Sequence, residues 1–366
     1  MTTLIEWTHF PDSIGETLNP IRAWHDDCVG WHCEKTSPGC RHCFAERQNL
    51  SGRFGGTKLR YTADSRAVVY LDQKVLEKPL HWRKPRTVLI CSMSDLFGAW
   101  VREQWIDRVL AVAALTHWKH RFLILTKQAT RMAEYFRGRP AQRIIDEANL
   151  LNEGHGGRLW NDGQTAAHVP SWPLPNVWLG VTVEHADYRD RIDQLREIPA
   201  AMRFVSCEPL LGEVDLSPWL RRVETCPGCG YQAQMPDTCP TCGDLPVVDV
   251  KAGFDWIIAG GESGPGARPM HPVWARLLRD QCQAASVPFF FKQWGGWVPS
   301  EAKPILGKHT GGGIFLRHDG SFGCQGDWWN GEAVAMDKVK NKKQAGRLLD
   351  GRKWNEFPEF NRRLGG

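Results

Sequence analysis

The chain has 366 residues, of which 42% are hydrophobic and 24% are charged, and it carries a formal net charge of +5. These values are typical of a soluble globular protein with one large domain or two ordinary ones. The longest near-apolar run, residues 109–115, is too short to span a bilayer, so no membrane partner is expected. The N-terminal segment lacks a basic start followed by an apolar run, so we expect a cytoplasmic location without a secretory signal.

The first distinctive segment is a cluster of three cysteines, Cys33, Cys40 and Cys43, with the spacing C-x6-C-x2-C. Twelve cysteines in a chain without a secretory signal indicate metal binding more than a disulfide scaffold. Structural zinc normally takes four protein ligands. A cubane [4Fe-4S] cluster, by contrast, can be held by three cysteines, which leaves one iron open to a small molecule. The cluster therefore predicts an iron–sulfur site with a chemical role, and Cys28 lies near enough in sequence to be considered as a fourth ligand.

Short apolar runs then recur along the chain and predict strands that are buried on both faces. They cover residues 17–21, 87–91, 121–125, 177–183, 203–206, 256–259 and 288–291. Amphipathic helices are predicted between them at 103–118, 188–198 and 274–285. Strands that alternate with helices indicate a parallel sheet, and no G-x-G-x-x-G follows an early strand. The pattern therefore predicts an α/β fold, a TIM-type (β/α) barrel, full or partial, that occupies residues 1–366 as a single domain.

Polar residues follow the predicted strands at their C-terminal ends, which form the functional face of a barrel. They are Ser92, Ser94, Asp95, Thr126, Lys127, Thr182, Glu184, Glu208, Glu262, Lys292 and Gln293. One or two such residues would be uninformative, because chains turn at strand ends, but their recurrence over six strands favours a site. We expect these side chains to converge on one mouth near the three cysteines. A lysine there is costly unless paired, so Lys127 and Lys292 are expected to pair with Glu184, Glu208 or Glu262.

A second metal site is predicted in a short insertion at residues 225–244. Its four cysteines, Cys226, Cys229, Cys239 and Cys242, have the spacing C-x2-C-x9-C-x2-C, and each pair is followed by glycine. Two such turns offer the four thiolates that tetrahedral zinc requires. Iron is the alternative occupant of a four-sulfur site. The insertion is therefore expected to be a small zinc ribbon with a structural role, because so few apolar residues do not fold alone.

The C-terminal segment, residues 338–366, is predicted to be a basic extension. It carries Lys340, Lys342, Lys343 and Arg347, the densest basic run of the chain. A solvated helix face is the favoured interpretation over a phosphate-binding stripe. The mild net charge permits contact with nucleic acid but does not require it. The partners considered are a nucleic acid and a protein encoded nearby.

Residues 35–46, which read KTSPGCRHCFAE, resemble the three-cysteine signature of the phage Gp37/Gp68 family, also catalogued as the domain of unknown function DUF5131. Further matching words follow in order: SMSDLF at 92–97, LTK at 125–127, WLGVTVE at 178–184, CEPLL at 207–211, GGESG at 260–264, FFKQWGG at 290–296 and RLLDGR at 347–352. The resemblance spans nearly the whole chain. It implies a likeness to radical S-adenosylmethionine (SAM) enzymes and hence a radical-SAM-like barrel.

In radical SAM enzymes three cysteines hold a [4Fe-4S] cluster, and SAM chelates the fourth iron. The resemblance implies these roles for the first cysteine cluster, and it places cofactor-binding residues beside the last cysteine and after the second strand. These residues are His42, Phe44, Ser92, Ser94 and Asp95. The chain departs from those enzymes in three ways. Its first cysteine gap is six residues in place of three, His42 stands before the last cysteine where those enzymes often have an aromatic residue set against the adenine, and its GGE word at 260–262 follows a late strand.

Three functional hypotheses result. The first is a radical-SAM-type enzyme acting on an unknown substrate, for which a nucleobase or nucleic acid is the suggested class. The second is a non-enzymatic iron–sulfur or zinc protein that binds nucleic acid, and the third is a barrel hydrolase that uses Asp95, Glu184 and Glu208. The residues assigned to catalysis are Asp95, Lys127, Glu184, Glu208, Glu262 and Lys292.

Overall fold

The computed structural model describes residues 3–52, 55–159, 172–220, 224–225, 232–233, 253–300, 313–323, 333–340 and 342–359. The four cysteines of the predicted zinc ribbon, Cys226, Cys229, Cys239 and Cys242, lie outside the described residues. The ribbon therefore stays a prediction. Of the insertion, the structure gives only the backbone of two short antiparallel strands, β9 (Glu224–Thr225) and β10 (Gln232–Ala233).

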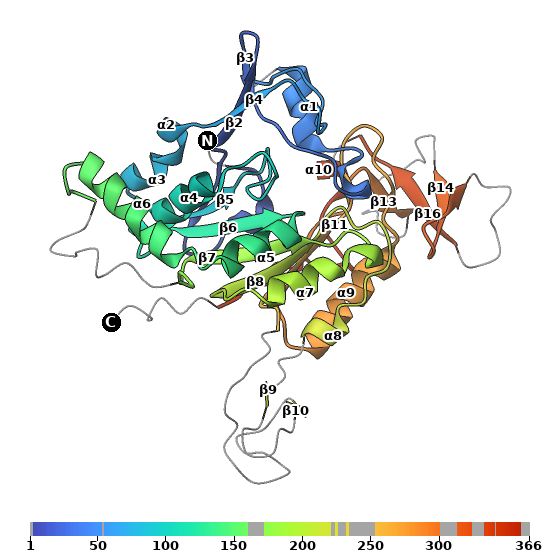
Figure 1. Cartoon of the computed structure of the whole chain (residues 1–366). Coiled ribbons are helices and arrows are strands. Elements are labelled where there is room, and N and C mark those ends of the chain that lie inside the picture. Colours follow the sequence, from blue (N-terminus) through green and yellow to red (C-terminus); the bar gives the residue numbers. More distant parts are fainter. Residues whose placement is uncertain are drawn as a thin grey trace, which may run out of the picture.

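The centre of the protein is a parallel sheet of seven strands, curled into a half-barrel (Figure 1). Its strands are β1 (Ile14–Leu18), β5 (Arg86–Ile90), β6 (Arg121–Thr126), β7 (Val177–Thr182), β8 (Met202–Cys207), β11 (Trp256–Gly260) and β12 (Phe289–Gln293). Their order in space follows their order in the chain, and the two edge strands, β1 and β12, do not pair with each other. The predicted α/β class is therefore confirmed, with a partial barrel rather than a closed one.

Helices cover one face of the sheet (Figure 1). They are α4 (Glu103–Leu115), α5 (Ala129–Arg137), α6 (Ala141–Gly154), α7 (Asp190–Arg196) and α9 (Pro272–Ala284), with the shorter α2 (Gln73–Leu76), α3 (Lys78–His81) and α8 (Ser217–Leu220) beside them. The main hydrophobic core forms between these helices and alternate strand residues such as Val88, Ile124 and Val205. This burial is the dominant favourable contribution to folding.

The opposite face of the sheet is filled by aromatic side chains. Trp178, Phe204 and Trp256 come from the strands, and Trp7 and Phe10 come from the N-terminal segment around the 3-10 helix η1 (Glu6–Thr8). The ring of Trp7 lies edge-on to that of Trp256 at 6.0 Å, and Phe10 is 5.4 Å from both Trp178 and Trp256. These rings fill the middle of this face of the half-barrel.

Two antiparallel sheets flank the half-barrel and were not predicted from the sequence. The first has the order β3-β2-β4 and lies with α1 (Phe44–Ser51) beyond the cysteine segment (Figure 1); its strands are β2 (Ile21–His25), β3 (Cys28–Gly30) and β4 (Val68–Leu71). The second has the order β13-β16-β14-β15, with β13 (Trp297–Pro299), β14 (Ile314–Arg317), β15 (Phe322–Gly323) and β16 (Ala333–Lys338). The first sheet is inserted between β1 and β5 of the parallel sheet, and the second follows β12.

The C-terminal segment covers the outer edge of β12. After the short helix α10 (Lys342–Ala345), the backbone oxygen of Trp354 accepts a hydrogen bond from Phe291 N at 2.9 Å, and Glu356 N donates to Phe289 O at 3.2 Å. An edge strand left open would present unpaired backbone groups to other chains. The described part of the predicted basic extension thus completes the sheet edge.

Candidate functional site

A cavity of about 330 Å³ opens at the C-terminal ends of the parallel strands. It is bounded by the ends of β5, β6, β7, β8, β11 and β12 and by the segment that carries the first three cysteines. Of the residues predicted to form the site, the following line it: Cys33, Cys40, Cys43, His42, Phe44, Ser92, Ser94, Asp95, Lys127, Glu208, Glu262 and Lys292. Strand-end residues from Ser92 to Lys292 therefore meet the three clustered cysteines in one cavity, as expected for parallel strands whose C-terminal ends open on the same side.

Glu184 is placed differently, behind the cysteine segment. Its side chain is fully buried, and one carboxylate oxygen accepts a hydrogen bond from Ser37 while the other pairs with Arg191 at 3.0 Å. A Cβ atom on Gly39 would come within 2.8 Å of the same carboxylate, so glycine is required for this close approach. Glu184 therefore anchors the segment between Cys33 and Cys40 and does not line the cavity, although its assignment was catalytic.

Asp95 is held by hydrogen bonds on both carboxylate oxygens. One oxygen accepts from Thr126 Oγ1 at 2.7 Å and from Phe97 N at 2.9 Å, and the other accepts from Lys127 N at 3.0 Å. Burial raises the pKa of this carboxyl, although the hydrogen bonds oppose the change. Asp95 thus joins the loop after β5 to the end of β6 and shapes the wall of the cavity.

The two serines of the same loop are also engaged. Ser94 Oγ donates to the carbonyl of His32 at 2.6 Å, which ties the loop to the residue before Cys33. Ser92 Oγ donates to Asn19 Oδ1 at 3.2 Å. Their predicted role in binding a cofactor stays a prediction, while their observed contacts fix the start of the cysteine segment.

The thiols of Cys33 and Cys43 pack against a small cluster of buried side chains that includes Tyr61 and Met93. Burial raises the pKa of the Cys33 thiol, and the nearby negative groups of Asp95, Cys43 and Cys40 add to this effect. Burial also raises the pKa of Cys43. Thiols in such surroundings resist ionisation unless a cation is present, and bound metal ions deprotonate cysteine ligands outright.

Cys40 has a different environment, formed by hydroxyl groups. Its sulfur lies 3.8 Å from Ser37 Oγ and 4.0 Å from Thr36 Oγ1 at the end of the 3-10 helix η2 (Pro38–Cys40). Such contacts to cysteine sulfur are among the features that tune iron–sulfur clusters. Cys28, which was considered as a fourth ligand, lies on β3 and is not among the residues that line the cavity.

The donor set fits a multi-iron cluster better than a single ion. In the described ranges, no three His, Cys, Asp or Glu side chains converge closely enough to hold one metal ion. A cubane cluster binds each cysteine through a different iron, so its thiolates need not converge on one point. A fourth cysteine, Cys91 after β5, also lines the cavity, but it is buried and lies outside the cysteine segment. The three half-buried thiols of the segment are therefore compatible with a [4Fe-4S] cluster that keeps one iron open.

Residues at the ends of β8 and β12, and in the loop after β11, form two ion pairs. Lys292 Nζ lies 3.1 Å from Glu208 Oε1, which is the kind of pairing expected for a lysine in this mouth. Glu262 forms a two-point ion pair with Arg268, whose Nη2 and Nε atoms lie 2.6 and 2.9 Å from the two carboxylate oxygens. No such partner is found for the ammonium of Lys127 within the described part of the chain.

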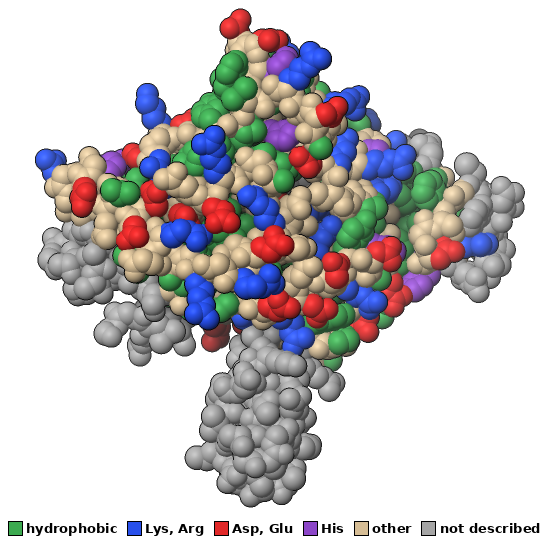
Figure 2. Space-filling view, in the orientation of Figure 1, with side chains coloured by type: hydrophobic (Ala, Val, Ile, Leu, Met, Phe, Trp, Pro, Cys, Tyr) green, Lys and Arg blue, Asp and Glu red, His purple; other side chains and the backbone are tan. Residues whose placement is uncertain are grey.

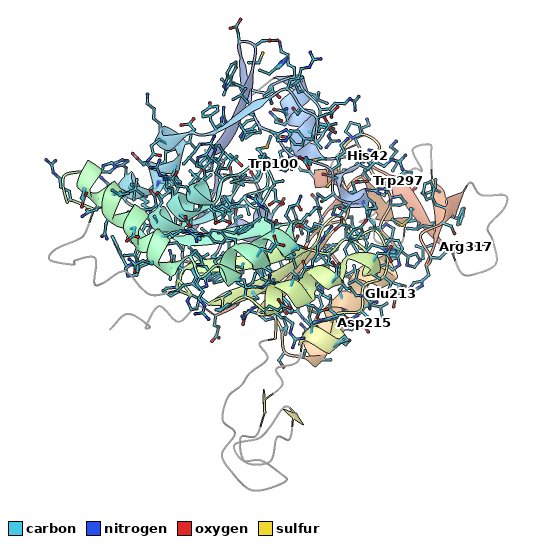
Figure 3. All side chains as sticks on the ribbon, in the orientation of Figure 1. His42, Trp100, Glu213, Asp215, Trp297 and Arg317 are labelled. Atoms are coloured by element: carbon cyan, nitrogen blue, oxygen red, sulfur yellow. The ribbon has the colours of Figure 1, made fainter. Side chains whose placement is uncertain are left out.

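Arg268 also connects the loop after β11 to the cysteine segment, because its Nη2 donates to the carbonyl of Pro38 at 2.9 Å. The imidazole of His42 lies against Gly266 of the same loop, where φ is +75° and a Cβ atom would lie 2.9 Å from the ring. Trp297 Nε1 bonds to the carbonyl of Ala267 at 2.6 Å, and Figure 3 shows the labelled His42 and Trp297 close together in the view. The loop after β11 is thus fixed from both sides.

Sequence reasoning missed the residues that hold the cysteine segment in place, namely Ser37, Arg191 and Arg268. The two arginines belong to no recognisable sequence motif, and their ion-pair partners are determined by the tertiary fold. The word GGESG at 260–264 pointed to this loop, but Arg268 lies four residues beyond it. Tyr61, whose hydroxyl donates to the carbonyl of Met93 at 2.9 Å inside the cavity wall, had no signal in the sequence.

The face of the molecule seen in Figure 2 carries both kinds of charge. Figure 2 shows basic and acidic side chains of the described residues interspersed over this face. In the described ranges, no helix is long and apolar enough to cross a membrane.

A family model described as "Protein of unknown function (DUF5131)" matches residues 3–358. The chain belongs to the DUF5131 family. No curated protein matches the chain, and no solved structure matches it. The phage Gp37/Gp68 name and the likeness to radical SAM enzymes are not part of this match and remain predictions.

Proposed function

We propose that this DUF5131 protein is an iron–sulfur enzyme of the radical SAM type. The observation that carries the proposal is the meeting of three thiols and charged strand-end side chains in one cavity at the C-terminal face of a half-barrel. In parallel α/β barrels this face holds the active site. When bound, a [4Fe-4S] cluster with SAM supplies one-electron chemistry that no side chain provides.

The residues of the chain have separable tasks in this proposal. Cys33, Cys40 and Cys43, which are all half-buried, would hold the cluster. Glu184 and Arg268 hold the segment that carries these cysteines. Positioning of this kind contributes to catalysis because a reacting group must be held in one geometry.

The hydrolase hypothesis is less well supported by the same contacts. Both oxygens of Asp95 and both oxygens of Glu184 are engaged by protein groups, and Glu208 is paired with Lys292. A general base needs access to the proton that it removes. A non-enzymatic protein that binds nucleic acid needs clustered basic side chains. The described residues of the face in Figure 2 carry interspersed basic and acidic side chains, so this face does not support that hypothesis.

The proposal is tested by SAM cleavage. The full chain is purified and reconstituted with iron and sulfide under anaerobic conditions, then reduced with dithionite in the presence of SAM. We expect 5′-deoxyadenosine and methionine to form, and the Cys40→Ala variant to form neither. Cys28→Ala is the matched control, because Cys28 does not line the cavity, and it should retain cleavage. A reconstituted protein with full iron that leaves SAM intact would contradict the proposal.

A further inference from the structure

The floor of the cavity contains polar atoms that the protein leaves unpaired. Trp7 forms this floor, because its ring belongs to the aromatic cluster that fills the half-barrel and its side chain also lines the cavity. The segment η1 that carries Trp7 contacts β12, whose last residue is Gln293. Gln293 lines the same cavity. Lys127, which follows β6, lines the same cavity. We call Trp7, Gln293 and Lys127 together the floor site.

Trp7 and Gln293 are 2% and 6% exposed, yet one polar atom of each has no hydrogen-bond partner among the described residues. These atoms are Trp7 Nε1 and Gln293 Oε1. The amide nitrogen of Gln293 donates to the carbonyl of Gly261 at 3.4 Å, which sets the orientation of the amide and leaves the oxygen as the free acceptor. An unpaired buried polar group costs about 1–3 kcal/mol, so two on one cavity wall indicate a ligand that pairs with them.

The free groups define the chemistry of that ligand. The site offers two donors, the indole N–H of Trp7 and the ammonium of Lys127, and one acceptor, the amide oxygen of Gln293. The complementary edge has two acceptors and one donor. Uracil and thymine present this set as two carbonyl oxygens on either side of an N–H. Adenine presents one donor and one acceptor, and guanine has two donors and one acceptor, so both purines match less well. Cytosine has two acceptors and one donor, but its donor lies at one end of the edge, so it does not match an acceptor that stands between two donors.

The walls suit a flat ring. The aromatic side chains of Phe44, Tyr61 and Trp7 all line the cavity, and aromatic rings provide stacking surfaces for bases. The volume of about 330 Å³ lies in the range of small-molecule pockets.

We propose that the floor site binds an oxopyrimidine of the uracil or thymine type, with Gln293 accepting the ring N–H and Trp7 and Lys127 donating to the carbonyl oxygens. The proposal names the substrate class for the function proposed above and takes this cavity as the active site. Binding of the base, however, requires neither the cluster nor SAM, so the two proposals can fail separately.

Calorimetric titration of the full-length protein, as purified and without reductant, tests the assignment with uracil and 3-methyluracil. The methyl group removes the ring N–H and keeps both carbonyls. We expect uracil to bind and 3-methyluracil to bind more weakly by about tenfold or more, because the acceptor of Gln293 is left unpaired. Equal binding of the two compounds, or no binding of uracil, would overturn the proposal. Tighter binding of adenine than of uracil would also overturn it, since the floor would then suit the adenine of SAM.

Gln293→Met and Trp7→Phe locate the site, because both keep most of the side-chain volume and remove the polar atom. Each should weaken uracil binding by about tenfold. The ligand-free melting temperature should stay the same or rise for Gln293→Met, because a buried unpaired group is removed. It should fall for Trp7→Phe, because the smaller ring packs less well against Phe204 and Trp256. Gln142→Met, on the exposed surface of α6, is the matched control and should bind uracil normally. Unchanged uracil affinity in both floor variants would overturn the assignment. If the wild-type protein binds uracil but does not cleave SAM, only the proposed function is contradicted.

Discussion

The buried carboxylate of Glu184 accepts a hydrogen bond from Ser37, which lies in the segment between the first two clustered cysteines. The same carboxylate pairs with Arg191, a residue of α7 that is itself almost fully buried. The position of the cysteines is therefore linked to the fourth strand of the half-barrel through one side chain. Because a buried ion pair is strongly destabilising when one partner is removed, this link is open to a direct test.

Glu184→Gln should lower the free energy of unfolding by about 3 kcal/mol, because the guanidinium of Arg191 remains buried without its counter-charge. The variant should also bind less iron on reconstitution, since the cysteine segment loses its anchor. Urea unfolding and iron analysis measure the two effects. Glu197→Gln is the control: its partner Arg137 is 3.4 Å away and both side chains are exposed, so the change should be below about 1 kcal/mol. Equal effects of the two variants would contradict the anchoring role.

His120 gives a prediction about pH, independent of the cavity. It is 2% exposed; its Nδ1 accepts from Arg86 N at 3.2 Å, and its Nε2 lies 3.1 Å from the carbonyl of Pro79. These partners fit the neutral ring, and burial lowers the pKa of His120 from 6.5 to about 4. Between pH 6.5 and pH 4 the imidazole of His120 is therefore protonated in the unfolded chain but neutral in the folded protein. The free energy of unfolding falls as the pH drops from about 6.5 to about 4, by up to about 3 kcal/mol.

His120→Gln should remove this contribution while leaving every carboxylate in place. Urea unfolding at a series of pH values measures the free energy of unfolding of both proteins. The wild-type protein should lose more stability than the variant between pH 6.5 and 4. Parallel curves over that window would show that His120 does not titrate as argued.

The prediction for the inserted ribbon concerns Cys226, Cys229, Cys239 and Cys242, which lie outside the described residues. They are expected to bind one zinc ion independently of the first cluster, because the spacing supplies four thiolates on two turns. Cys229→Ser should release the zinc and leave the iron content unchanged, whereas Cys40→Ala should do the reverse. Metal analysis of the two variants reads both metals in one experiment. Loss of zinc in Cys40→Ala, or its retention in Cys229→Ser, would contradict independent sites.

The parallel sheet could be predicted from the sequence because its strands are buried on both faces and read as continuous apolar runs. The run at 177–183 corresponds to β7 (Val177–Thr182), and the helix predicted at 103–118 corresponds to α4 (Glu103–Leu115). The first strand was displaced, from 17–21 to β1 (Ile14–Leu18), because the chain turns at Asn19 and Pro20 and residue 21 already begins β2.

The antiparallel sheets were missed because their strands are short and only partly buried. Trp24 of β2 pairs with Val29 on one side and Val68 on the other, and all three side chains are exposed. Because these exposed positions carry apolar residues, the sequence shows no alternation of apolar and polar residue types, which is the pattern that identifies a half-buried strand.

Most residues that line the cavity could be predicted from the sequence, but the contacts between them could not. The rule that strand ends share one mouth located Asp95, Lys127, Glu208 and Lys292. It did not show that Glu184 turns behind the cysteine segment, because the direction of a side chain after a strand depends on the loop that follows. Nor did it single out Trp7, whose residue type is used for packing far more often than for binding.

Iron content tests the central claim most directly. After anaerobic reconstitution, iron and sulfide are measured in the wild-type protein and in Cys33→Ala, Cys40→Ala, Cys43→Ala and the control Cys28→Ala. We predict about four iron and four sulfide per chain in the wild type and in the control, and loss of the cluster in each of the other three variants. Retention of full iron in any one of those three variants, or its loss in Cys28→Ala alone, would contradict the three-cysteine site.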